Sequence, residues 1–255
     1  MHLDILDLTA FYGSPLGGVA RRIIAQKVRQ HWSRADGETL IALGYGTPYL
    51  GSYRSEVRRL GAFMPAQQGA LVWPPTGPVS TVLVEEAKLP VADNSVDKLL
   101  AVHCLELSEQ ARPLLREMWR VLAPEGRLLL IVPNRNGVWS RREATPFGHG
   151  QPYSRMQLER LLEDVLLTPT AWSTALHALP LTHRLSVRWA LGLERFGARL
   201  WPRLGGVILV EARKEVAATL PAGGALARRT PRLATAEGLV SRKSSQRHSP
   251  RQNPE

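Results

Sequence analysis

The sequence has a single cysteine, Cys104, among its 255 residues. One thiol excludes an intramolecular disulfide and any metal site built from several cysteines, and it favours a reducing, cytoplasmic location. No apolar run approaches the roughly 20 residues that a membrane helix needs, and runs such as Leu128 to Val132 are far shorter. The N-terminal segment carries Asp4 and Asp7 and lacks a basic flank before an apolar run, so we expect no secretory signal.

Acidic residues are also few. Asp and Glu number 22 against 33 Lys and Arg, which gives a formal charge of +11. This excess permits partners such as nucleic acid, anionic lipid or acidic metabolites. About half of it lies in residues 216–255, which hold seven basic and two acidic residues. Because the rest of the chain shows no basic motif interleaved with aromatics, nucleic acid is the least favoured partner.

The composition changes near residue 215. Residues 216–255 lack sustained apolar periodicity and are rich in Pro, Ser, Gly, Ala and Arg, which is typical of a disordered segment. We therefore expect one folded domain over residues 1–215 and a basic, disordered tail over residues 216–255.

Within residues 1–215, short apolar runs bounded by turn residues alternate with helical patterns. This alternation favours an α/β fold with a parallel sheet and helices on both faces. Buried strands are expected at 39–46, 98–106 and 127–133. Helices are expected at 18–32, at 111–122 and from the Ser154/Gln157 capping box onward.

The first of these strands ends in Gly44, Tyr45 and Gly46. Glycine lets the backbone approach a ligand closely, and a helix that follows offers free N–H groups. A plain tight turn would give the same pattern, so the residues alone leave both interpretations open.

The segment from Leu89 to Val132 contains a distinctive series of motifs. Leu89-Pro90 precedes Asp93-Asn94-Ser95, a strand then opens at Asp97, and a helix ends in RVLAPEGRLLL. In sequence and spacing the series resembles the class I S-adenosylmethionine-dependent methyltransferases of the type 11 domain group. The resemblance implies a Rossmann-like three-layer α/β/α sandwich with a mostly parallel seven-stranded sheet. The cofactor S-adenosylmethionine would lie across the carboxyl ends of the first strands.

The resemblance also implies site residues. The 44–46 turn would lie beside the methionine part of the cofactor, and Glu85 or Glu86 near its adenine amino group. His103 would lie next to the cofactor on the substrate side. Each has an alternative interpretation: Glu85 and Glu86 as surface charges, and His103 as a hydrogen-bonded core histidine.

The first motif departs from the family pattern. Ala42 stands where the family has an acidic residue, and Pro48 where it has a third glycine. Each lost charge-assisted hydrogen bond costs about 1.5 to 3 kcal/mol, so cofactor affinity should fall unless Tyr45 or Tyr49 packs on the cofactor. The alternative function is therefore a pseudo-methyltransferase that acts by binding a partner.

A long loop over residues 134–154 holds five side chains that can bind or react, Arg135, Arg141, Arg142, His149 and Tyr153. Long loops at the carboxyl edge of a sheet commonly form lids or substrate walls. His149 or Tyr153 is the candidate catalytic base, and the arginines would recognise an anionic small-molecule acceptor. In the competing interpretation, glycine turns tie the loop down and its arginines are solvated. The sequence thus predicts methylation of a small molecule and indicates neither a metal site nor an oligomeric state.

Overall fold

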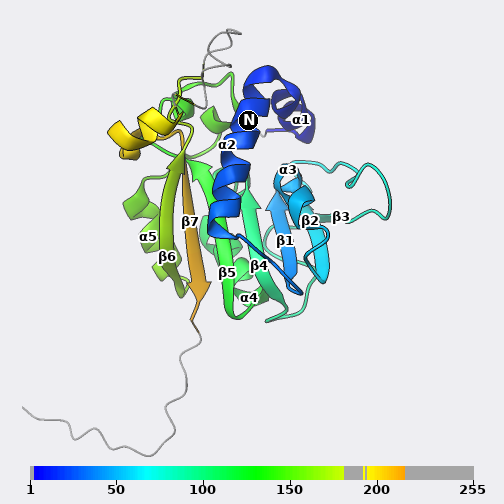
Figure 1. Ribbon diagram of the computed structural model, residues 1–255. Helices are drawn as coiled ribbons and strands as arrows, with labels where there is room; N and C mark the ends of the chain where they lie inside the picture. Colours follow the sequence, from blue (N-terminus) through cyan, green and yellow to red (C-terminus); the bar gives the residue numbers. More distant parts are fainter. Residues whose placement is uncertain (1–2, 181–191, 193, 216–255) are drawn as a thin grey trace, which may run out of the picture. The chain divides into compact units, whose positions relative to one another are not determined.

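A seven-stranded sheet organises the part of the chain that the computed structural model describes, residues 3–180, 192 and 194–215. The strand order is β3-β2-β1-β4-β5-β7-β6, and β7 alone among these strands runs antiparallel to its neighbours (Figure 1). The strands are β1 (Thr39–Gly44), β2 (Arg59–Pro65), β3 (Thr81–Val84), β4 (Val96–Val102), β5 (Leu122–Pro133), β6 (Leu167–Ala175) and β7 (Val207–Lys214). The tail expected over residues 216–255 lies outside the described residues.

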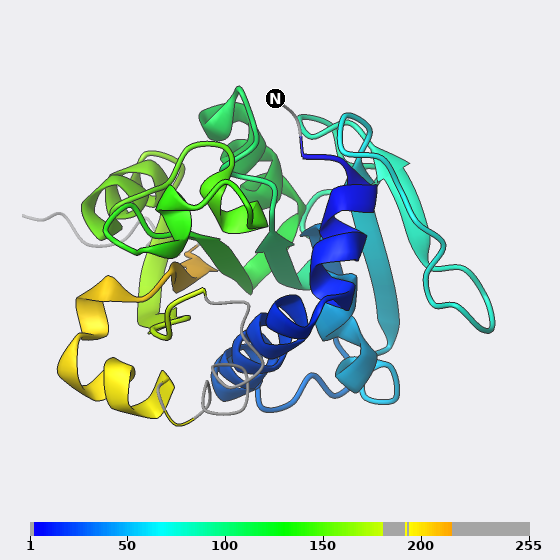
Figure 2. The same ribbon diagram turned by 90° about the horizontal axis from the view of Figure 1, so that it is seen from above.

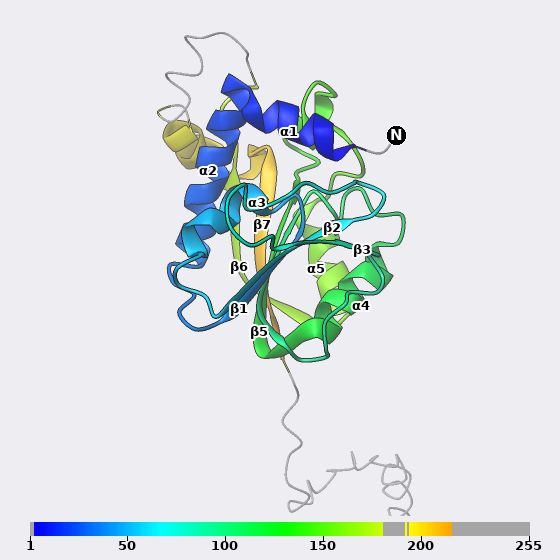
Figure 3. The same cartoon turned by 90° about the vertical axis from the view of Figure 1, so that its right-hand side faces the viewer.

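Helices cover both faces of the sheet, which confirms the predicted three-layer fold. Figure 3 shows α2 and α3 on one side of the sheet and α4 and α5 on the other. The α-helices are α1 (Ile5–Gly13), α2 (Pro15–His31), α3 (Thr47–Leu50), α4 (Ala111–Val121) and α5 (Arg155–Glu163). The 3-10 helices are η1 (Gly51–Tyr53), η2 (Trp139–Arg141), η3 (Pro146–Gly148) and η4 (Pro202–Leu204), and residues 194–200 are also helical.

Local capping residues explain where α1, α2 and α5 begin. Helix α2 starts three residues earlier than its apolar periodicity indicates, because the Ser14 hydroxyl accepts the Gly17 N–H at 3.1 Å and Pro15 occupies the first turn. The predicted Ser154/Gln157 capping box of α5 is confirmed. Helix α1, which we did not predict, begins at a cap formed by the Asp4 carboxylate.

The hydrophobic core lies in two layers, one on each face of the sheet. One layer joins α1, α2 and α3 to the sheet, and the other joins α4 and α5 to it. The predicted stripe of α2 is buried in the first layer, where Ala20, Ile24 and Val28 are at most 1% exposed. Among the described helices, none is long and apolar enough to cross a membrane.

Candidate functional site at the carboxyl ends of the strands

The 44–46 turn follows β1 and packs against the end of β4. Gly44 has a φ of 81°, and a Cβ atom there would lie 2.1 Å from the Val102 carbonyl oxygen. The Tyr45 N–H donates to the same oxygen at 2.8 Å. A Cβ atom on Gly46 would lie 2.4 Å from the Cβ of Ala42. Contacts of the chain with itself therefore require both glycines, with or without a bound cofactor.

Three tyrosines pack together at this turn. Tyr12 of α1 stacks on Tyr45 with ring centroids 5.3 Å apart and meets Tyr49 edge-on at 6.5 Å. All three residues are buried. Burial, as the largest cause, raises the pKa of Tyr12 and Tyr49 well above 10, so both hydroxyls are neutral. Helix α1 thus covers the turn that was expected to hold the methionine part of the cofactor (Figure 2).

His103 connects α1 to the loop that follows β4. Its Nε2 atom lies 2.9 Å from the Tyr12 hydroxyl, and its Nδ1 atom lies 3.1 Å from a carboxylate oxygen of Glu106. Because a carboxylate only accepts, these partners assign the ring proton to Nδ1 and make Nε2 the acceptor from Tyr12. The Gln68 amide donates to the His103 carbonyl at 2.9 Å. Sequence reasoning missed Tyr12 and Gln68, since Tyr12 and His103 are 91 positions apart.

A cavity of about 240 Å³ opens between the ends of β2 and β3 and the loop after β4. Its lining includes three carboxylates and three neutral polar side chains, those of Glu85, Glu86, Glu109, Gln67, Ser108 and Gln110. No basic residue lines it. The two predicted glutamates therefore meet at one cavity, whereas the 44–46 turn and His103 belong to the buried cluster beside it.

The 134–154 loop borders the same edge. The Phe147 ring lies 5.0 Å from the His103 ring. Tyr153 is buried with its hydroxyl 3.4 Å from the Leu105 carbonyl oxygen, and burial raises the pKa of Tyr153 to about 12. The Nε2 atom of His149 lies 2.8 Å from the Glu143 carbonyl oxygen. The Tyr153 hydroxyl and the His149 ring, the two candidate bases, thus each contact a backbone carbonyl oxygen.

The three arginines of this loop do not converge. Arg142 donates to the Pro180 carbonyl oxygen, and Arg135 and Arg141 are exposed. None of them lines the 240 Å³ cavity. The loop is anchored at Gly150, where a Cβ atom would lie 2.2 Å from the Glu106 carbonyl oxygen. This arrangement agrees with the competing interpretation of a loop tied down by glycine turns.

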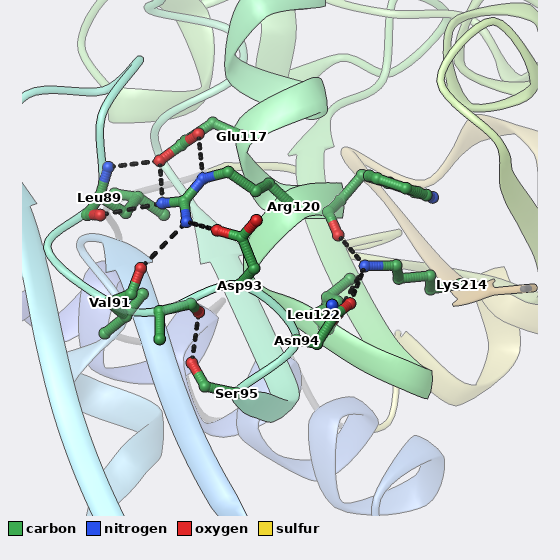
Figure 4. A network of polar contacts seen from close by, with 11 residues as sticks. Leu89, Val91, Asp93, Asn94, Ser95, Glu117, Arg120, Leu122 and Lys214 are labelled. Atoms are coloured by element: carbon green, nitrogen blue, oxygen red, sulfur yellow. Dashed lines mark hydrogen bonds and ion pairs between the residues drawn. The ribbon is translucent and has the colours of Figure 1, made fainter.

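The residues that carry the family resemblance form a polar network around Arg120 (Figure 4). The guanidinium donates to Glu117 at 2.6 and 2.9 Å, to the Asp93 carboxylate, and to the Leu89 and Val91 carbonyl oxygens at 3.1 Å. Glu117 in turn accepts the Leu89 N–H at 2.6 Å. The network fastens the connection between β3 and β4 to α4, so these motif residues hold the fold.

Lys214, at the end of β7, forms a second polar cluster beside the Arg120 network. Its ammonium group donates to Asn94 Oδ1 at 2.7 Å and to the Trp119 and Leu122 carbonyl oxygens at 2.8 Å. The side chain is 2% exposed, and burial lowers the pKa of Lys214. Asn94 adopts a φ of 57°, which asparagine tolerates better than most residues.

Comparison with known proteins agrees with this fold. A family model described as a methyltransferase domain matches residues 65–130. No curated protein sequence matches the chain. Residues 65–130 therefore resemble a methyltransferase domain, and the fold of the described residues is that of the class I S-adenosylmethionine-dependent methyltransferases.

Several solved structures share the fold at low sequence identity. A chain of the complex between the Haloferax volcanii Trm112 methyltransferase activator and a methyltransferase is 16% identical, with a TM-score of 0.60, and 85% of this chain and 100% of that chain are covered. The geranyl diphosphate C-methyltransferase of Streptomyces coelicolor A3(2) is 17% identical, with a TM-score of 0.50 and coverages of 74% and 78%. The [4+2]-cyclase SpnF is 17% identical, with a TM-score of 0.54 and coverages of 77% and 82%. Because a cyclase shares the fold, the fold alone does not define the reaction.

Proposed function

We propose that the protein is an S-adenosylmethionine-dependent methyltransferase acting on a small-molecule acceptor. The acidic cavity carries this proposal, because Glu85 and Glu86 line it at the end of β3, inside the segment that matches the methyltransferase domain. A carboxylate at this place can accept hydrogen bonds from an adenine amino group, and Gln67 can meet the ribose hydroxyls.

The chain fits the two ends of this cofactor unequally. The adenosine end suits the polar cavity, whose lining carries carboxylates and no competing cation. The methionine end belongs at the 44–46 turn, where Tyr12 is stacked on Tyr45 and Ala42 replaces the expected acid. Full binding therefore requires α1 to shift or the Tyr12 side chain to turn away. When bound, the cofactor supplies a methyl group on a sulfonium for attack by a nucleophile.

A small-molecule acceptor is supported by the Streptomyces coelicolor relative, whose structure holds geranyl diphosphate with S-adenosyl-L-homocysteine. His149 and Tyr153 stay the candidate bases of this proposal, although the raised pKa of Tyr153 disfavours it. Once screening with labelled cofactor has found an acceptor, His149→Ala should slow turnover by roughly 10²-fold if this imidazole removes the acceptor's proton. Normal turnover would leave His149 as a loop contact to Glu143.

The decisive experiment is calorimetric titration of the full chain with S-adenosylmethionine. Glu85→Gln should weaken binding about tenfold or more, as expected for a lost charge-assisted hydrogen bond. Glu86→Gln should have less effect, since consecutive residues seldom face one ligand. Glu163→Gln, at an exposed position of α5, is the matched control and should bind normally. Parental affinity in both cavity variants would refute the adenine placement.

The second candidate is a pseudo-methyltransferase, which the packing of Tyr12 on the 44–46 turn favours. If the protein is a pseudo-methyltransferase, calorimetric titration with S-adenosylmethionine should show no binding, either to the full chain or to its Tyr12→Ala variant. Binding that is present in Tyr12→Ala and absent in the parent would show that α1 closes a competent site, and would support the enzyme.

A further inference from the structure

A second and larger cavity, of about 610 Å³, lies around the end of β6. Its walls come from α2, the carboxyl end of β5, the start of α5, and the segment between β6 and β7. Figure 1 shows residues 194–204 of that segment beside the end of β6 and the start of β7. None of the residues predicted for the cofactor or for catalysis lines this cavity.

The charge of this lining is of one sign. Lys27, Arg155 and Arg203 contribute to it from three separate elements, and no acidic residue lines it. Within residues 3–180, 192 and 194–215, these three side chains form no ion pair. Three cations that face one cavity repel each other, and an anion between them would remove that repulsion.

A fourth lining residue, His177, is held by contacts at both ring nitrogens. Its Nδ1 atom lies 3.0 Å from the Glu194 carboxylate, and its Nε2 atom lies 3.2 Å from the Thr174 hydroxyl oxygen. The Thr174 hydroxyl donates its proton to the Pro202 carbonyl oxygen at 2.7 Å, the shorter of its two contacts. These contacts fix the orientation of the His177 ring in the wall of the cavity.

Two of the cationic residues are held by neighbouring residues, Arg155 through its side chain and Arg203 through its backbone. The Arg155 guanidinium lies over the Trp172 ring at 4.7 Å from its centroid, which orients its planar fork. The buried Asn134 amide donates to the carbonyl oxygens of Arg203 and Gly205 at 3.1 and 2.7 Å. The backbone that carries Arg203 is thereby fastened to the end of β5. The Arg155 fork, already oriented on Trp172, loses little entropy when a ligand binds.

We propose that this cavity binds a multiply charged anionic small molecule, a phosphate ester or a polycarboxylate. Arg155 and Arg203 would bind its anionic groups as two-point forks, and Lys27 would add a point charge. The proposal concerns binding alone and does not rest on methyl transfer, because the acidic and the basic cavity share no lining residue.

Calorimetric titration of the full chain with inorganic pyrophosphate, and separately with citrate, tests the proposal. At physiological ionic strength at least one probe should bind at a single saturable site. Arg155→Ala and Arg203→Ala should each weaken that binding about tenfold or more. Arg160→Ala is the matched control, because this exposed arginine lies on the same helix as Arg155 and does not line the cavity.

The outcomes separate a built site from general surface charge. Preference for pyrophosphate assigns a phosphate ligand, and preference for citrate assigns a carboxylate. Absence of saturable binding by either probe, or equal loss in Arg160→Ala, would overturn the proposal. Far-ultraviolet circular dichroism and the unfolding temperature check that Arg155→Ala and Arg203→Ala are folded. Glu85→Gln should bind pyrophosphate and citrate like the parent, because Glu85 does not line the basic cavity. Anion binding can therefore be confirmed even if the cofactor assignment fails.

Discussion

Replacing Arg120 by Met should destabilise the fold strongly, although the Arg120 side chain is 31% exposed. The variant keeps the length of the side chain and removes every hydrogen bond that the guanidinium makes. The variant leaves the Glu117 carboxylate, whose side chain is only 10% exposed, without its ion-pair partner. It also leaves the Leu89 and Val91 carbonyl oxygens without this donor.

The magnitude follows from these partners. Removing one member of a buried, hydrogen-bonded ion pair typically costs 3 to 5 kcal/mol, and an exposed pair costs less than about 1 kcal/mol. Because the Arg120 side chain is 31% exposed and Glu117 is nearly buried, we expect a loss of about 3 kcal/mol. For a domain of this size each kcal/mol lowers Tm by roughly 2 to 4 °C, so Tm should fall by about 6 to 12 °C.

The loss should depend on pH. Hydrogen bonds from Arg120 lower the pKa of Glu117, and burial opposes them less strongly. A carboxyl whose pKa is depressed by folding stabilises the native state above its unfolded pKa, about 4.3, and loses that contribution as pH falls through the folded pKa. In Arg120→Met, burial of Glu117 is no longer opposed by the guanidinium, so the difference between parent and variant should be largest near pH 7 and shrink as the pH falls toward and below about pH 4.

Urea and thermal unfolding at several pH values measure these differences. Arg112→Met is the control, because Arg112 lies on the same helix and its ion pair with Asp164 is largely exposed, at 62% and 48%. The control should lose less than about 1 kcal/mol. Equal losses in Arg112→Met and Arg120→Met, or no change in the difference with pH, would refute the structural role of this network.

Three further predictions concern stability. Gly46→Ala should cost about 1 to 3 kcal/mol by overpacking, because its new Cβ would lie 2.4 Å from that of Ala42, and urea unfolding measures the loss. Lys214→Met should cost roughly 2 to 4 kcal/mol, since it leaves three acceptors such as Asn94 Oδ1 without their donor, and a loss below 1 kcal/mol would contradict this role. Removal of residues 216–255 should leave Tm nearly unchanged, because that segment has too little apolar surface to offset its ordering entropy.

The sequence by itself determined the class of fold. The apolar runs of β1, β4 and β5, the stripe of α2 and the capping box of α5 are local signals, and each depends on residues a few positions apart. The motif series from Leu89 to Val132 indicated a methyltransferase-like fold, and several of its residues take part in the network around Arg120. The resemblance likewise suggested Glu85 or Glu86 for the adenine site from their spacing before the Leu-Pro pair, and this assignment stays a prediction.

Tertiary structure decided what surrounds these residues. Tyr12 reaches His103 across 91 positions of sequence, and Lys27, Arg155 and Arg203 meet at one cavity from three different elements. Such contacts depend on the twist of the sheet and on the paths of the connections, which no local pattern encodes. Periodicity and caps act over one or two helical turns. In contrast, the packing of α1 on the 44–46 turn and the basic cavity form only when distant segments pack against the same sheet.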